Sequence, residues 1–235
     1  MKFLCDAHQV SQLRPLRIWG TFSICGGAGA STTAFYLAMA AKNLGIKSIL
    51  VEGDVYSRRN IQFQKQERNW KSYENLEIKI PKNAYPTPLA SGITYLSFAE
   101  ACENSSRSVS HLLEGAAEEF DLIIIDLPRH FSEFTNSLIS KLTLLNLVGL
   151  SGIESVKTFE RLKSSSLDLG SSNLFLRTSR NSNLSAKESS YQMGFESFEA
   201  LPESESVKNF ETYGVLPSAK DGLLKLLQNF LSLNL

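Results

Sequence analysis

The sequence predicts an α/β fold, namely a doubly wound, mostly parallel sheet flanked by helices. Apolar, strand-like runs alternate along the chain with stretches of helical periodicity, and these runs are continuously apolar rather than alternating. Strands of a parallel sheet that is covered on both faces have this pattern. Right-handed crossovers between such strands give the doubly wound order. We expect an irregular lead-in over residues 1–16 and a single domain over residues 17–235.

Each element is predicted from its own residues and from the turn residues around it. β-branched and aromatic side chains mark the first strand, and Gly45 is expected to end the helix that follows it. The strands are expected at residues 17–24, 47–54, 92–98, 121–128, 143–150 and 173–179, with a last edge strand at 197–203. The helices are expected at residues 31–44, 108–120, 152–163, 204–213 and 218–232. The polar, proline-containing span 55–91 is expected to be the least regular part.

Composition narrows the class of protein. With 43% hydrophobic and 20% charged residues, the chain can build a sizeable core and is not expected to be disordered. The 24 basic residues balance the 24 acidic ones, so the chain as a whole is not drawn to nucleic acid or to an anionic membrane. Three cysteines without ligand-like spacing favour a reduced, cytoplasmic protein without disulfides or zinc. No run reaches the ~18 apolar residues that a membrane span needs.

The stretch SICGGAGAST follows the first strand and opens the first helix. Gly26, Gly27 and Gly29 allow the backbone to fold closely around an anion, and the helix behind them adds positive potential. Ser31 and Thr32 are placed to offer hydroxyl groups to Mg²⁺ and to cap the helix. We interpret this stretch as a phosphate-binding loop, with a structural glycine-rich turn as the alternative.

Two aspartates follow apolar strands and are expected at the same edge of the sheet as the loop. Asp54 closes VEGD, and Asp126 follows the apolar run of DLIIIDLP. Ligands of open α/β sheets bind at the carboxyl ends of the strands. Asp126 has the form of a metal-organising acid, and Asp54 is a candidate for positioning water or Mg²⁺. The alternative for Asp126 is a carboxylate that caps a strand end, and the alternative for Asp54 is one that accepts hydrogen bonds from a turn.

In this order, CGGAGAST, ILVEGD and FDLIIIDLP resemble the ParA/MinD group of deviant phosphate-loop ATPases, and GGAGAST with DLPR is most similar to the CpaE/TadZ branch, close to septum-site CpaE-like proteins. The resemblance spans about residues 17–231 and implies a SIMIBI/MinD-like P-loop fold that binds ATP or ADP with Mg²⁺. The residues expected to line the phosphates are Gly26, Gly27, Ala28, Gly29, Ala30, Ser31 and Thr32. Ser31 and Asp126 are then expected to hold Mg²⁺ through the nucleotide, and Asp54 and Asp126 to serve catalysis.

Both lysines of the family's loop are replaced in this chain. Cys25 stands where one lysine reaches across a dimer, and Ala30 stands where the other binds the β- and γ-phosphates. Losing such a cation costs on the order of 10²-fold or more in rate. Since the backbone cradle remains, we expect weak nucleotide binding with slow or absent hydrolysis. A substitute cation is expected, if there is one, from Arg58, Arg59 or Arg129.

Three functional hypotheses follow. The first is a CpaE/TadZ-like localisation or assembly factor with a degenerate nucleotide site, which acts with protein partners of a pilus, secretion or division apparatus. It is cytoplasmic and is recruited to a pole or to membrane-associated machinery. The second is an active ATPase that uses a substitute cation and cycles between monomer and homodimer. The third is a scaffold that binds no nucleotide.

Two further segments raise other kinds of contact. Residues 55–82 hold seven basic and three acidic side chains, which suits a DNA-binding or acidic-partner face, although a solvated insertion is the simpler interpretation. The leucine-rich stretch 218–232 has the spacing of an amphipathic helix. Its few basic residues favour a final helix packed on the sheet over a membrane-surface helix.

Overall fold

The computed structural model describes residues 16–53, 91–97, 113, 115–116, 118–129, 133–165, 169, 172–178, 182–213 and 215–235. Within them, seven strands form one sheet in the order β3-β2-β4-β1-β5-β6-β7, and every pairing is parallel. The strands are β1 (Arg17–Ser23), β2 (Ser48–Glu52), β3 (Thr94–Ser97), β4 (Leu122–Asp126), β5 (Leu144–Leu150), β6 (Ser172–Arg177) and β7 (Glu199–Leu201). The predicted doubly wound α/β class is therefore confirmed.

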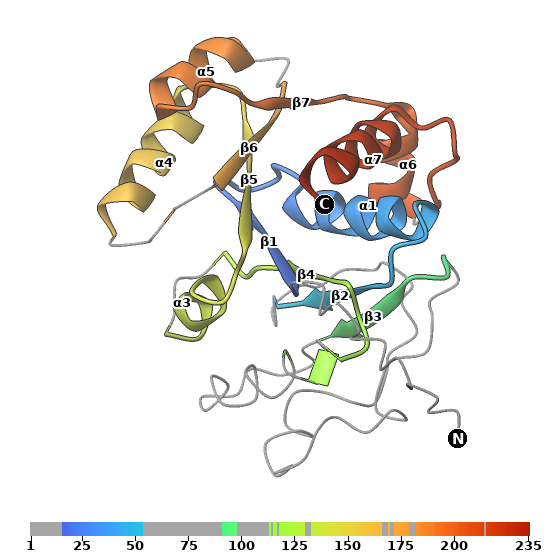
Figure 1. Cartoon of the computed structure of the whole chain (residues 1–235). Coiled ribbons are helices and arrows are strands. Elements are labelled where there is room, and N and C mark those ends of the chain that lie inside the picture. The colour runs from blue at the N-terminus through green and yellow to red at the C-terminus, as the bar shows by residue number, and fades with distance from the viewer. Residues whose placement is uncertain are drawn as a thin grey trace, which may run out of the picture.

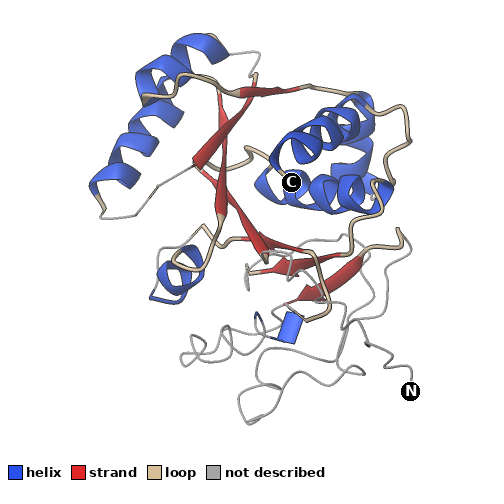
Figure 2. Cartoon of the chain, in the orientation of Figure 1, coloured by secondary structure: helices blue, strands red, loops and turns tan. Residues whose placement is uncertain are grey.

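Helices cover both faces of the sheet (Figures 1 and 2). On one face lie α1 (Ala30–Asn43), α6 (Glu205–Tyr213) and α7 (Gly222–Asn234). On the other lie α3 (Glu133–Ile139), α4 (Ile153–Ser164) and α5 (Ala186–Met193). The sheet thus separates two hydrophobic cores.

Strand β4 shows why the apolar runs are continuous. Ile123 and Ile125 belong to the core beneath α3, α4 and α5, whereas Leu122 and Ile124 belong to the core beneath α1 and α7. Because successive side chains of a strand point to opposite faces, a strand buried on both sides needs an apolar residue at every position. The same register brings Asp126, the last residue of β4, to the carboxyl edge of the sheet.

The last helix packs on the core, as the simpler interpretation of the tail predicted. The side chain of Asp221 accepts a hydrogen bond from the backbone N–H of Leu224 at 3.0 Å and caps α7. Phe230 then contacts Trp19 and Phe175 edge to face, with ring centroids 5.7 and 5.0 Å apart. The aromatic contacts fix α7 against the face of the sheet that α1 also covers.

Most predicted elements occur within a few residues of their expected bounds, but two helices were not predicted. These are α3 and α5. Of the helix expected over 108–120, only residues 113, 115 and 116 are described as helical, and the rest of that prediction lies mainly outside the described residues. Gly45 follows α1 with a φ of 73° and ends the helix as expected. The N–H groups of Gly45 and Ile46 donate to the carbonyls of Lys42 and Ala41, as in a Schellman motif.

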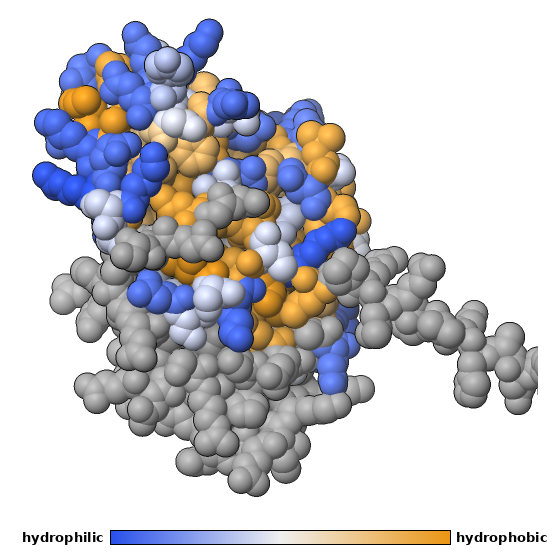
Figure 3. Space-filling model, turned by 60° about the vertical axis from the view of Figure 1, so that its left-hand side comes forward, coloured by the Kyte–Doolittle hydropathy of each residue, from blue (hydrophilic) through white to orange (hydrophobic). Residues whose placement is uncertain are grey.

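The surface that Figure 3 shows differs in character between its upper and middle parts. Hydrophilic side chains gather in the upper part of this view, where α4 and α5 lie, and apolar side chains are found in the middle of the view. Among the described residues, no helix combines the length and the apolar character that crossing a bilayer requires. The span 55–82 and Cys5 and Cys102 lie outside the described residues, so the predictions on them stay predictions.

Candidate functional site

The glycine-rich loop joins the carboxyl end of β1 to the first turn of α1. The N–H of Ile24 donates to the carbonyl of Val148 at 2.8 Å, which continues the pairing of β1 with β5 to the start of the loop. Gly29 has a φ of 92° and is the N-cap residue of α1, and such left-handed backbone is rarely adopted by residues with a side chain. The loop therefore has the strand-turn-helix position that the sequence predicted.

The N-terminus of α1 is arranged to attract negative charge. No side chain caps this end of the helix, and no acidic residue lies in its first turn. The dipole of a helix and its first backbone N–H groups favour an anion at this position. Ser31 and Thr32 are both buried here, at 8% and 9% exposure, so their hydroxyl groups lie within the folded loop rather than in bulk water.

Neither of the two lysine positions holds a cation in its own side chain. Ala30 is buried at 6% exposure and packs in the core beneath α1. Cys25 is partly buried against the same core, and its Sγ lies 3.2 Å from Oγ of Ser155 on α4. The thiol of Cys25 is therefore held by contacts within this chain.

An arginine lies over the loop instead. A Cβ built on Gly26 would come within 2.9 Å of Nη1 of Arg129, so the guanidinium rests against the loop backbone where a side chain would otherwise stand. Arg129 follows β4 by three residues and is exposed. Of the three arginines predicted as substitute cations, Arg129 is at the loop, and Arg58 and Arg59 lie outside the described residues.

Asp126 lies at the carboxyl edge of the sheet, as predicted. Asp126 pairs in register with Thr21 of β1 and with Glu52 of β2, and it is 5% exposed. Its backbone carbonyl accepts a hydrogen bond from the N–H of Gly53 at 2.8 Å, so Gly53, the residue after β2, stays next to β4. Asp54, the next residue, lies outside the described residues and its role remains a prediction.

Sequence reasoning missed two charged residues beside the loop. Arg177 ends β6, and its Nη2 lies 3.2 Å from Oε1 of Glu211 on α6. The same carboxylate oxygen accepts a hydrogen bond from Oγ1 of Thr32 at 2.9 Å. The place of Arg177 at the carboxyl end of a predicted strand was the available signal, whereas nothing in the spacing marked Glu211.

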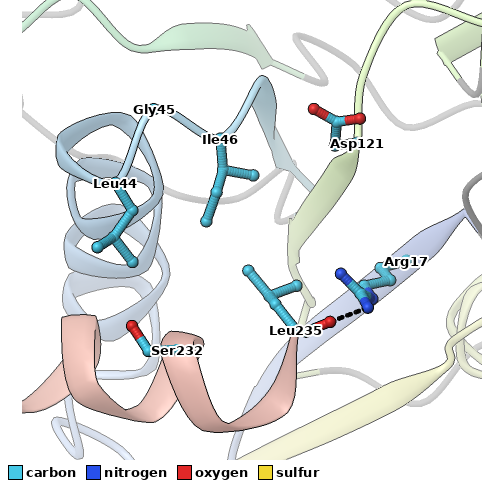
Figure 4. Close-up of a pocket in the computed structure, with 7 residues that line it drawn as sticks. All are labelled: Arg17, Leu44, Gly45, Ile46, Asp121, Ser232 and Leu235. Carbon is cyan, nitrogen blue, oxygen red and sulfur yellow. Dashed lines mark hydrogen bonds between the residues drawn. The ribbon is translucent and has the colours of Figure 1, made fainter.

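The opposite edge of the sheet carries a pocket of about 470 Å³ (Figure 4). Arg17 and Asp121, at the amino ends of β1 and β4, line it together with Leu44, Ser232 and Leu235. The guanidinium of Arg17 donates a hydrogen bond to the backbone carbonyl of Leu235 inside the pocket. None of the predicted site residues lines this pocket, so it is separate from the loop.

Comparisons with known proteins agree with this fold. The chain is similar to a ParA family ATPase from Chlorobium tepidum TLS (18% identity, TM-score 0.70, covering 92% of this chain and 97% of that one). It is also similar to the cell division ATPase MinD of Pyrococcus furiosus (19% identity, TM-score 0.71, covering 92% and 99%). A third similar structure is the septum site-determining protein MinD of Pyrococcus horikoshii OT3 in complex with Mg-ADP (18% identity, TM-score 0.72, covering 93% and 97%).

At these identities the structures establish the fold alone, and no curated protein matches the sequence. The family is established by the sequence model described as ATPase MipZ, which matches residues 23–146. That match covers more than half of the chain and includes the loop, Asp54 and Asp126. The chain therefore belongs to the MipZ family of ATPases, within the ParA/MinD type of P-loop proteins.

Proposed function

We propose that this protein binds ATP or ADP with Mg²⁺ at the loop and hydrolyses ATP slowly or not at all. The observation that carries the proposal is the loop itself: an uncapped α1 N-terminus after β1, with Asp126 at the end of the neighbouring strand β4 and with Ala30 and Cys25 in the lysine positions. Backbone groups supply the attraction for phosphate, which explains binding. The ammonium group of a loop lysine acts mainly on the charge that develops during phosphoryl transfer, so its absence accounts for the weak turnover that we propose.

The residues present fit a magnesium–nucleotide complex by their chemistry. The backbone of Gly26, Gly27, Ala28, Gly29 and Ala30 would cradle the phosphates. The hydroxyl of Ser31 and the carboxylate of Asp126 would hold Mg²⁺, which prefers oxygen ligands. The ion neutralises phosphate charge when it is bound. Thr32 and Asp54 complete the proposed set, with Asp54 positioning water.

In the cell, we propose that the protein is a CpaE/TadZ-like localisation or assembly factor. The support is the sequence pattern GGAGAST followed by DLPR, together with membership of an ATPase family. Its proposed partners are proteins of a pilus, secretion or septum-site apparatus, and a homodimer is part of the proposal. Its proposed location is the cytoplasm, with recruitment to a pole or to membrane-associated machinery.

Calorimetric titration with ATP and Mg²⁺ tests the proposal. We expect saturable binding that is weakened in Asp126→Ala and unchanged in Glu154→Ala, which removes an exposed carboxylate on α4. Hydrolysis is followed in parallel by phosphate release. Absence of binding at millimolar ATP would refute the proposal and favour the third hypothesis, a nucleotide-free scaffold.

A second candidate function is an active ATPase with a substitute cation. The observation that favours it is the guanidinium of Arg129, which lies against the loop at Gly26. An arginine placed there can stabilise charge on a transferring phosphoryl group. Turnover that is measurable in the wild type and lost in Arg129→Ala, with ATP binding retained, would establish this function over the first.

A further inference from the structure

The charged residues that the loop contacts form a network across three elements. Oε1 of Glu211, on α6, accepts from Oγ1 of Thr32 at 2.9 Å and pairs with Nη2 of Arg177 at 3.2 Å. Thr32 belongs to α1 and Arg177 ends β6. One carboxylate oxygen therefore links the first turn of α1 to the carboxyl end of β6.

This carboxylate lies at the anion-attracting end of α1. The Cβ position of Gly29, the N-cap residue, is 3.7 Å from Oε1 of Glu211 and 3.5 Å from Nη1 of Arg177. No side chain caps the helix there, and a negative charge is stabilised near a helix N-terminus. The chain thus brings a carboxylate of its own to the end of α1 where phosphate groups are expected.

We propose that Glu211 is an internal anion that nucleotide phosphates displace from the loop, and that Arg177 then passes from Glu211 to those phosphates. The inference rests on the proposed nucleotide binding and adds regulation of the same site. Without the displacement, phosphate and carboxylate would stand as like charges beside one another. With it, the arginine and the hydroxyl of Thr32 become available to the ligand.

The strength of the network suits an exchange rather than a permanent bond. The side chains of Arg177 and Glu211 are 16% and 32% exposed, so water already reaches both. Ion pairs that water screens contribute little free energy. A guanidinium also binds phosphate through two parallel hydrogen bonds, whereas here Nη2 alone is paired with Oε1 of the carboxylate.

Helix α6 holds Glu211 in place through its neighbour. Phe210 stacks on Phe35 with ring centroids 4.5 Å apart and meets Tyr36 edge to face at 5.5 Å. Because both rings belong to α1, release of Glu211 loosens only the polar contact between α6 and α1, while the aromatic contact keeps the helix docked. Displacement is therefore expected to raise hydrogen exchange in residues 205–213 without unfolding the domain.

The experiment is a calorimetric titration with Mg-ADP of the full chain and of two neutralised variants. Glu211→Gln removes the internal anion and keeps the side-chain size, and Glu154→Gln is the control on an exposed carboxylate of α4. We expect Glu211→Gln to tighten binding about tenfold, the scale of one hydrogen bond to a charged group, and Glu154→Gln to leave it unchanged. In the Glu211→Gln background, Arg177→Gln is expected to weaken binding about tenfold.

Each outcome decides the matter. Binding by Glu211→Gln that is tighter than measurable binding by the wild type supports the displacement. If the wild type binds and Glu211→Gln is no tighter, the displacement is refuted while the proposed nucleotide binding stands. If the wild type does not bind at millimolar Mg-ADP, both the displacement and the proposed nucleotide binding are refuted. A second measurement does not depend on any variant: in the wild type, saturating Mg-ADP should speed hydrogen exchange in residues 205–213, and unchanged exchange overturns the displacement.

Discussion

Phe210 provides the most demanding test of how α6 is held. It is 1% exposed, and it contacts two aromatic rings of α1, those of Phe35 and Tyr36. Replacing a buried phenylalanine by alanine removes its transfer free energy and leaves a cavity, together about 3–5 kcal/mol. Since both lost contacts are ring pairs between tightly buried neighbours, we expect Phe210→Ala to lower the free energy of unfolding by a value in this range.

The assay is urea unfolding followed by circular dichroism, with Tyr191→Ala as the control. Tyr191 is 83% exposed on α5, so its replacement should change the free energy of unfolding by less than about 0.5 kcal/mol. A decrease in the free energy of unfolding of less than about 1.5 kcal/mol in Phe210→Ala would refute the reasoning, because removing a ring that is packed on two sides should cost more than this. It would mean that α6 is not docked on α1 by this side chain.

Three further predictions concern the same region. Burial raises the pKa of Tyr36 from 10.0 to about 12; the charges of Asp221 and Glu211 act in the same direction, and Ser206 and Arg177 act against it. The contribution of the neutral Tyr36 hydroxyl to stability is therefore complete below pH 10 and is lost as the pH rises through about 12. Ultraviolet titration of the wild type against Tyr36→Phe measures this pKa. Gly29→Ala should lower the free energy of unfolding by about 1–2 kcal/mol in urea and also weaken Mg-ADP binding, whereas the same change at Gly194, with a φ of 83° far along the chain, should affect stability alone. Ala30→Lys should raise ATP turnover on the order of 10²-fold in a phosphate-release assay, and no gain would mean that more than the lysine is missing.

The class of the fold could be predicted because its cause is local. Each inner strand needs apolar residues at successive positions, and runs such as LIIID of β4 have this pattern in the sequence. The same runs fix where the strands end, so the place of Asp126 at the sheet edge could also be predicted. The position of the glycine-rich loop could be predicted in the same way, because a predicted strand precedes it and a predicted helix comes after it.

The two missed helices differ in how much signal they carried. Helix α5 begins with a capping box, in which Ser185 and Glu188 exchange hydrogen bonds, and it ends at Gly194 with a φ of 83°. Both signals, the Ser-x-x-Glu spacing and the glycine after the helix, stand in the sequence. Helix α3 spans seven residues, too few for a periodic pattern to distinguish it from a polar connection.

Contacts across the chain could not be predicted at all. Thr32 and Glu211 are 179 residues apart, and Arg177 and Glu211 are 34 apart, so no local spacing relates them. Their meeting depends on where β6 ends beside β5 and on how α6 docks against α1. A single sequence indicates which elements form, but the partner of a charged surface residue is decided by packing.

The loss of the two loop lysines changes where the positive charge of the site comes from. In this chain it comes from guanidinium groups on other elements, Arg129 beyond β4 and Arg177 at the end of β6. A lysine within the loop is positioned by the loop itself, whereas these arginines are positioned by the sheet edge and by the residues with which they pair. Arg177 is paired with Glu211, so under the proposed nucleotide binding the charge available to the ligand would depend on the state of α6. Under the same proposal, replacing loop cations by distant ones would weaken the chemistry of the site and couple its occupancy to the surface of the domain.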